Sequence, residues 1–296
     1  GGEDRLRECI RFAAEKYHPQ AVFIANSCVS GVIGDDTKAI AEEMETELGI
    51  PVMAVSAHGF LDGEYYAGYL DAARALVDRF MHPAERKPGT VALLGDCGGM
   101  HGEYAKELRR LLALLDLKVT AQFPSYLSLD EMQAVPEAEL LVVLGSAMSD
   151  EKQALLIAFA EELHTRFGTP YFAEAFAGGA EETAHWLRCI GARCHREAAA
   201  EETIRREEAA FERVLARARE TLAGRRTVLV VGRELHWLQP EILLRLIERA
   251  GIRLSGIILL ALFTEAQRRE VEDGLRACTD VPILAVEDPA SEELLR

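Results

Sequence analysis

Short apolar runs alternate with amphipathic stretches along the whole chain. The apolar runs are nearly continuous in Val, Ile, Leu and Ala, as in "AVFIAN" and "TVLVVG", which is typical of strands covered on both faces of a parallel sheet. We predict strands at 21–26, 52–57, 90–95, 119–123, 140–145, 171–175, 227–232, 255–261 and 282–286. Apolar residues at helical spacing predict helices at 3–17, 36–48, 66–81, 102–115, 150–167 and 240–250.

Strands that alternate with helices indicate βαβ units. We therefore predict an α/β fold with multiple Rossmann-like domains, whose parallel sheets are flanked by helices. Two seams divide the chain: "MHPAERKPG" reads as a linker, and a charged helical stretch ends at Gly224. We predict a partial Rossmann-like domain at 1–85, a second Rossmann-like domain at 86–196, and a linking helix plus a third such domain at 197–296.

Composition narrows the functional classes. The 296 residues are 49% hydrophobic, enough for a sizeable core. A net charge of −16 without a basic block argues against nucleic-acid binding. The longest apolar run, "SGIILLALF", is shorter than the roughly 20 residues that span a bilayer. We expect a cytoplasmic protein without membrane contact, whose six scattered cysteines are free thiols or metal ligands.

Ligands of α/β sheets bind outside the carboxyl ends of the strands, so the loops there carry the candidate chemistry. In "ANSCVSGVIGDD", Gly34 permits a tight turn, Asp35 caps the next helix and Asp36 complements its dipole. No capping rule explains Cys28. That thiol is either a small buried filler or a ligand or reactive group.

Two further loops hold groups that suit chemistry. His58 follows the second strand and is either a ligand or acid–base group, or a histidine that bonds to its own turn. The stretch "GDCGGMHGEY" forms a glycine-rich turn that suits phosphate at a helix start or close packing, although it lacks the GxGxxG and P-loop patterns. Its candidate residues are Cys97, Gly98, Gly99 and His101.

A third cysteine-containing stretch, "CIGARCH", lacks the repeated CxxC spacing of common zinc sites. It follows an amphipathic stretch whose apolar face includes Trp186 and Leu187. We therefore predict that Cys189 belongs to the core.

The order of these motifs resembles the nitrogenase component 1 superfamily. Residues 19–60 hold Cys28 after a strand, then "IGDD", then Gly59-Phe60 after the next strand, in the family's order and spacing. The stretch beginning "LLGDCGGMHGEYAKEL" resembles the start of the family's second Rossmann-like domain, and "TRFGTPYFAEAF" resembles the segment that closes it.

This resemblance implies that Cys28 is a thiolate ligand of an iron–sulfur cluster at a subunit interface. It also implies a homo- or hetero-oligomer with a related component 1 subunit. The family's other cluster cysteines lie in an N-terminal region that this sequence does not contain. We expect that the sequence is trimmed, or that Cys97 or a partner completes the ligand set, or that no cluster binds.

Departures from the family concern the catalytic cofactor. Dinitrogenase has an anchoring cysteine after a second-domain strand, where this chain reads "LLVVLGSAM". The histidine near that cofactor falls at Tyr69, and the far C-terminal ligand histidine has no counterpart. We therefore expect no reduction of dinitrogen.

The resemblance implies an oxidoreductase that takes electrons from an ATP-dependent iron–sulfur reductase and reduces an unsaturated or tetrapyrrole-like substrate. The alternative is a non-catalytic scaffold or carrier for metallocluster or tetrapyrrole maturation. A third class is an α/β protein that binds a small anion. The cavity expected to bind the substrate would be lined by Cys97, Gly98, Gly99, His101, His58 and Tyr69.

Overall fold

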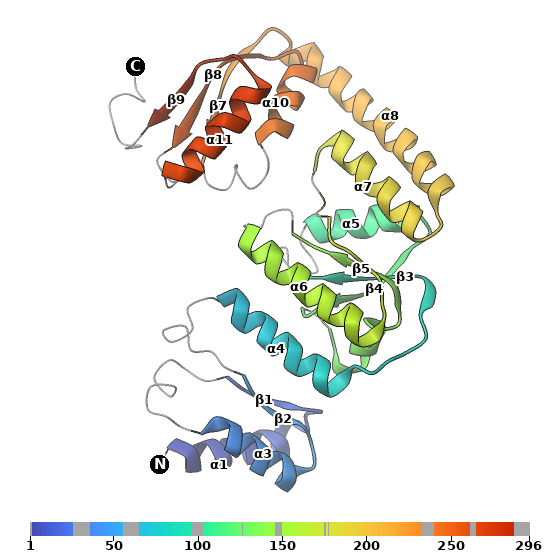
Figure 1. The fold of residues 1–296 in the computed structure, drawn as a ribbon, viewed down its shortest axis with the longest axis vertical. Coiled ribbons are helices and arrows are strands. Elements are labelled where there is room, and N and C mark those ends of the chain that lie inside the picture. Colours follow the sequence, from blue (N-terminus) through green and yellow to red (C-terminus); the bar gives the residue numbers. More distant parts are fainter. Residues whose placement is uncertain are drawn as a thin grey trace. The chain divides into compact units, whose positions relative to one another are not determined.

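Strands and helices alternate along the described chain, apart from two consecutive helices within residues 180–222 (Figure 1). The computed structural model describes residues 2–25, 36–55, 65–95, 103–125, 127–145, 150–174, 176, 178–232, 240–260 and 265–286. The strands are β1 (Val22–Ala25), β2 (Val52–Val55), β3 (Lys87–Leu94), β4 (Lys118–Phe123), β5 (Ala138–Val143), β6 (Tyr171–Phe172), β7 (Arg226–Val231), β8 (Arg253–Leu260) and β9 (Ile283–Val286).

The helices that connect these strands are mostly amphipathic. They are α1 (Gly2–Tyr17), α3 (Thr37–Leu48), α4 (Tyr65–Phe80), α5 (Glu103–Leu114), α6 (Asp150–Phe167), α7 (Ala180–Arg193), α8 (Glu197–Leu222), α10 (Pro240–Arg249), α11 (Glu265–Cys278) and the 3-10 turn η1 (Leu129–Ala134). No helix within the described ranges is both long and apolar enough to cross a bilayer.

The strands form three sheets, with the orders β1-β2, β4-β3-β5-β6 and β7-β8-β9. The first and third sheets are parallel. In the central sheet, the residue after β3 bonds to the end of β4 and the start of β3 bonds to the residue before β5, so these strands also run in one direction. The predicted α/β class with parallel sheets is confirmed.

The chain divides into two compact units. The first contains residues 1–100, 119–142 and 154–171, and the second contains 101–118, 143–153 and 172–296. Each of the three sheets falls within one of the three blocks expected from the sequence. The three-domain division itself stays a prediction.

The first sheet packs against helices α1 and α3. Its core consists of Ile10, Ile24, Ile40, Ala41, Met44 and Val52. Helix α3 begins after Asp36, whose carboxylate accepts a hydrogen bond from the Ala39 backbone N–H at 3.0 Å. Asp36 is therefore the N-cap, and the assignment of that cap to Asp35 was wrong by one residue because the helix begins one residue later than predicted. Gly49 ends the helix in the left-handed conformation, with φ 67°.

The third sheet is covered by helices on one face only, within the part of the chain that the structure describes. Alternate residues Val231, Ile257 and Leu259 pack against Leu244 of α10 and the α11 residues Val271 and Leu275. The opposite face carries the paired row Val230, Ile258 and Leu284, in which Val230 and Leu284 are each 47% exposed.

Among the described residues, the third sheet therefore lacks the second covered face that was expected. Its strand order follows the sequence order, so both crossovers run in the same direction across the sheet. Right-handed crossovers that run in one direction place their helices on the same face.

Helix α4 holds the first unit together. Its residues Leu70, Ala73 and Val77 are buried at helical spacing, which supplies the main apolar contribution to its packing. Two ion pairs flank this stripe: Arg74 contacts Glu162 of α6 at 2.7 Å, and Arg79 contacts Glu45 of α3.

Near the start of α4, the Tyr69 hydroxyl lies 3.0 Å from the Ser125 hydroxyl, within hydrogen-bonding distance. Ser125 lies two residues after the end of β4, so this contact ties the helix to the carboxyl end of the central sheet. The Tyr69 ring also stacks on Tyr66, with 5.5 Å between ring centroids.

We expect that Glu45 makes the stability of the protein depend on pH. Its carboxylate is held by the Arg79 guanidinium and by the Val52 N–H at 3.1 Å, which together lower the pKa of Glu45. A lowered folded-state pKa stabilises the protein above the unfolded value of about 4.3, and this contribution is lost as the pH falls below it. Urea denaturation of the wild type and Glu45→Gln should therefore differ most above about pH 5 and converge at lower pH.

The matched control is Glu42→Gln, at an exposed position of the same helix. It should show no comparable pH-dependent difference. A Glu45→Gln difference that is constant from neutral to acidic pH would show that the charge of Glu45 does not stabilise the fold.

The Tyr69–Ser125 contact predicts a measurable coupling. Tyr69→Phe and Ser125→Ala each remove one hydroxyl, and a typical hydrogen bond contributes about 0.5–1.5 kcal/mol to stability. A double-mutant cycle by urea denaturation should give a coupling energy in this range. Tyr17→Phe at an exposed position of α1 should leave stability nearly unchanged, and a cycle that is additive within error would contradict the contact.

Candidate functional site

The strand order of the central sheet has a reversal between β3 and β5. From β3 the chain continues through α5 to β4 on one side, whereas from β5 it continues through α6 to β6 on the other side. Open α/β sheets bind ligands outside the carboxyl ends of strands at such a reversal. The loops that follow β3 and β5 are therefore where functional groups are expected.

The loop after β3 contains the predicted residues Cys97, Gly98, Gly99 and His101, which lie outside the described residues. The described chain reaches Gly95, which has φ 108°, a conformation that favours glycine. The Gly95 N–H donates to the Phe123 carbonyl at 2.8 Å. The backbone pairing with β4 thus extends to Gly95, one residue beyond the end of β3.

Cys28 and His58 also lie outside the described residues. Their loops follow β1 and β2, whose last residues Ala25 and Val55 are register partners. Each candidate residue follows its strand end by three positions. The two loops therefore begin next to each other at one edge of the first sheet, and the roles of Cys28 and His58 stay predictions.

Tyr69 is the predicted site residue that falls within the described ranges. It lies half-buried in the first two turns of α4, with its hydroxyl next to Ser125. The phenol supplies a hydrogen-bonding group at the end of β4 rather than a metal ligand of the kind that a histidine would offer. Its assignment to a substrate cavity stays a prediction.

Gln153 was not singled out from the sequence, yet it lies against the end of β5. Its side-chain amide packs on Gly145, where even a β-carbon would collide with the amide oxygen. Both polar atoms of this amide are buried without a hydrogen-bond partner among the described residues. A buried amide of this kind needs partners. The sequence offered one sign of this contact: a glycine, Gly145, at the end of a predicted strand, followed by the polar Gln153 early in the next predicted helix.

Cys189 does not belong to the core, and that prediction was wrong. Helix α7 buries Trp186, Leu187 and Ile190, whereas Cys189 is half-exposed. The fully buried thiol of the "CIGARCH" stretch is Cys194. The amphipathic pattern correctly identified the apolar face, but Cys189 lies at its border, where burial depends on the rotation of the helix.

Aromatic packing fixes α7 against the end of β6. The Trp186 ring lies 6.3 Å from Phe172 and 5.3 Å from Phe176, measured between ring centroids. Tyr104 adds an edge-on contact to Phe176 at 5.8 Å and donates its hydroxyl to the Phe176 carbonyl at 3.4 Å. These contacts hold Phe172 and Phe176 against α7.

The second unit also contains a groove of about 240 Å³ between α5, α7, α8 and α10. Its floor is apolar and includes Leu187 and Phe211. The arginines that line it are each paired with a glutamate: Arg110 with Glu207 at 2.7 Å, Arg245 with Glu182, and Arg249 with Glu212. Because these charges are already compensated, the groove offers little attraction for a small anion.

The carboxylate of Glu207 illustrates this compensation. The Arg110 guanidinium lowers the pKa of Glu207 below its ordinary value, and burial opposes the shift more weakly. The pair therefore stays charged and bonded across the neutral pH range.

Comparisons with known proteins agree with this architecture. The family model for nitrogenase component 1 type oxidoreductases matches residues 1–287. The nitrogenase iron-molybdenum cofactor biosynthesis protein NifE of Klebsiella pneumoniae is 32% identical over 249 residues, which cover 80% of this chain and 52% of that protein. The nitrogenase molybdenum-iron protein alpha chain of Clostridium pasteurianum is 29% identical over 240 residues, covering 78% of this chain and 42% of that protein.

The fold matches as well. A solved structure described as nitrogenase Cp1 at pH 5 has a TM-score of 0.65 at 23% identity, covering 92% of this chain and 57% of that chain. The chain spans about half the length of the relatives that it matches. The motifs around Cys28, the parallel sheets and the match over residues 1–287 lead to the same assignment: the chain belongs to the nitrogenase component 1 type oxidoreductase family.

Proposed function

We propose that this protein is a non-catalytic scaffold or carrier for the maturation of a metallocluster. The observation that carries the proposal is its similarity to the NifE protein of Klebsiella pneumoniae, a cofactor biosynthesis protein, at 32% identity over 80% of this chain. That similarity favours a maturation role over the reduction of a substrate.

The end of β5 supports the same choice. Residues 140–148 read "LLVVLGSAM" and contain no cysteine, so a thiolate anchor for a catalytic cofactor is missing from this stretch. At Gly145, the space next to the backbone is filled by the Gln153 amide. A carrier must release its cargo, and fewer thiolate bonds make release easier.

We propose Cys28 and Cys97 as the thiolates that hold the cargo, since iron–sulfur clusters are bound through cysteine sulfur. Both belong to loops that follow parallel strands, the usual position of ligand-binding groups in α/β sheets. His58, His101 and Tyr69 would line the same cavity, with Gly98 and Gly99 allowing close approach to the backbone.

We further propose that a related component 1 subunit completes the assembly. The first sheet has two strands in the described residues, and Phe23 on β1 is 46% exposed. A two-stranded sheet is marginally stable without further packing. A neighbouring subunit would cover this sheet and supply additional cluster ligands.

The oxidoreductase remains the second candidate, because the Clostridium pasteurianum relative is a nitrogenase molybdenum-iron protein alpha chain. In that case the protein would take electrons from an ATP-dependent iron–sulfur reductase and reduce an unsaturated or tetrapyrrole-like substrate. The two functions differ in turnover, which can be measured.

The test starts with anaerobic purification and reconstitution with iron and sulfide. We expect bound iron and sulfide, and transfer of radiolabelled iron to a cluster-free component 1 acceptor in an amount limited by the loaded protein. With an ATP-dependent reductase and candidate substrates, no multiple turnover is expected. Sustained reduction over many turnovers would overturn the carrier proposal and favour the oxidoreductase.

Cysteine variants identify the thiolates. Cys28→Ser and Cys97→Ser should each lower the bound iron at least several-fold, because each removes a proposed ligand. The matched control is Cys9→Ser, at an exposed free cysteine of α1, which should retain the wild-type iron content. Equal iron content in all three variants would refute the ligand assignment.

A further inference from the structure

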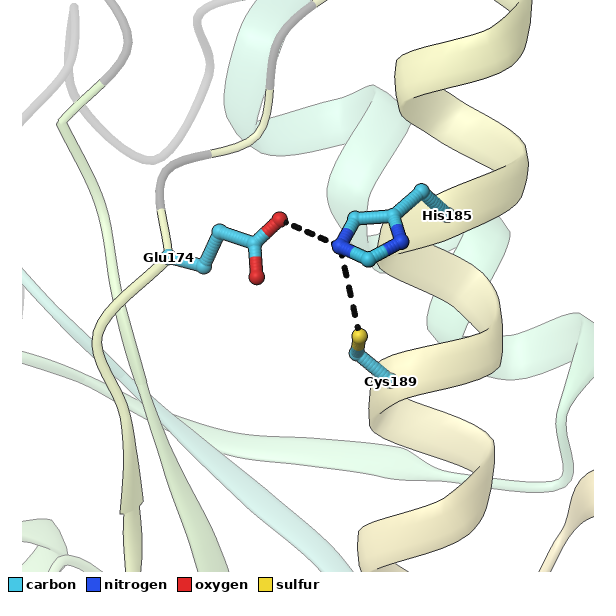
Figure 2. A group of neighbouring side chains, drawn as sticks. All are labelled: Glu174, His185 and Cys189. Carbon is cyan, nitrogen blue, oxygen red and sulfur yellow. Dashed lines mark hydrogen bonds and ion pairs between the residues drawn. The ribbon is translucent and has the colours of Figure 1, made fainter.

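Three different metal-binding side chains lie close together in the second unit. Glu174 follows β6, whereas His185 and Cys189 lie one turn apart on α7 (Figure 2). One ligand atom from each residue lies within 4.8 Å of the others. We propose that Glu174, His185 and Cys189 bind a single divalent transition-metal ion of the zinc type.

The imidazole is the centre of the group. Its Nε2 atom lies 2.8 Å from a Glu174 carboxylate oxygen and 3.6 Å from the Cys189 sulfur. Figure 2 shows both contacts meeting at this one nitrogen. A ring nitrogen has one in-plane direction for a hydrogen or a lone pair. It therefore cannot form an ideal hydrogen bond to both neighbours, whereas a metal ion between the three atoms would be bonded by all of them.

The nitrogen–sulfur distance suits a tetrahedral ion. Zinc bonds of about 2.0–2.1 Å to nitrogen and about 2.3 Å to sulfur place these two atoms about 3.5 Å apart. The observed nitrogen–sulfur distance is 3.6 Å. The carboxylate oxygen, at 2.8 Å from the nitrogen, would move away by about half an ångström to reach its own tetrahedral position.

Helix α7 fixes the relative positions of two of the three ligands, His185 and Cys189. Residues at i and i+4 lie on the same face of a helix, and two ligands at this spacing bind zinc in helical metal sites. Trp186 and Ile190 are buried on the neighbouring face, so α7 cannot rotate without exposing apolar surface. The backbone carbonyl of Cys189 accepts a hydrogen bond from Arg193 at 3.2 Å, which adds local support.

The combination of donors selects the class of metal. Thiolate and imidazole favour zinc, cobalt and ferrous iron over magnesium and calcium, which prefer oxygen ligands. The His185 side chain is 60% exposed, so an ion can enter from solvent. Three protein ligands leave the fourth position for water or a group from a bound molecule.

The test uses cobalt as a spectroscopic probe in metal-free protein under anaerobic conditions. We expect one equivalent to produce the ligand-field bands of tetrahedral cobalt together with a thiolate-to-cobalt charge-transfer band, and zinc to displace both. Cys189→Ser should remove the charge-transfer intensity of this site. His185→Gln and Glu174→Gln should each weaken zinc binding at least about 10-fold.

The matched control is Cys278→Ser, at an exposed free cysteine of α11, which should bind cobalt and zinc as the wild type does. Circular dichroism checks that each variant is folded. Because Cys28 and Cys97 can also bind cobalt, the titrations are repeated in Cys28→Ser/Cys97→Ser protein, where the Cys189-dependent band should persist. A cobalt spectrum that is unchanged by Cys189→Ser in that background, or no binding there, would overturn the proposal while leaving the proposed carrier function untouched.

Discussion

The direction of the strand-to-strand crossovers determines most of what this structure presents to its surroundings. Parallel strands need a helix or long connection between them, and these connections are right-handed. In the central sheet the crossovers from β3 and from β5 lead in opposite directions, the arrangement at which open α/β sheets bind ligands outside their carboxyl ends. In the third sheet both crossovers lead in the same direction, so α10 and α11 cover one face. The same rule therefore produces a candidate ligand-binding edge in one sheet and an exposed apolar face in the other.

Much of the fold was predictable because a strand buried in a parallel sheet is a short, continuous run of aliphatic residues. The runs around β3, β5 and β7 are continuous in aliphatic residues, and each lies within a few residues of its predicted position. The exposure of Val230 and Leu284 was not predictable in this way, because an aliphatic run looks the same whether one face or both are covered. Which face is covered depends on strand order, and strand order is a tertiary property.

The candidate site was predictable to a smaller extent. Strand ends locate the loops of Cys28, His58 and Cys97, but the geometry of those loops lies outside the described residues. Cys189 shows the limit of periodicity at the border of a helix face, where a small rotation separates a buried thiol from an exposed one. Glu174 was not predicted as a metal ligand, because folding rather than sequence spacing brings it close to His185 and Cys189 of α7. Family membership and the similarity to a NifE protein supply the functional context that these residues alone do not.

The pairing of β1 with β2 has a consequence for chemistry at their ends. Ile24 is buried in the core while its neighbour Phe23 points the other way, and a slip of one residue along the strand would exchange their faces. Such a slip would also shift the starting point of the Cys28 loop by about 3.3 Å relative to that of the His58 loop. The burial preference of Ile24 thus keeps the starts of the Cys28 and His58 loops in register. A core substitution that tolerates both registers would therefore alter the relative position of the two loop starts without changing any residue of either loop.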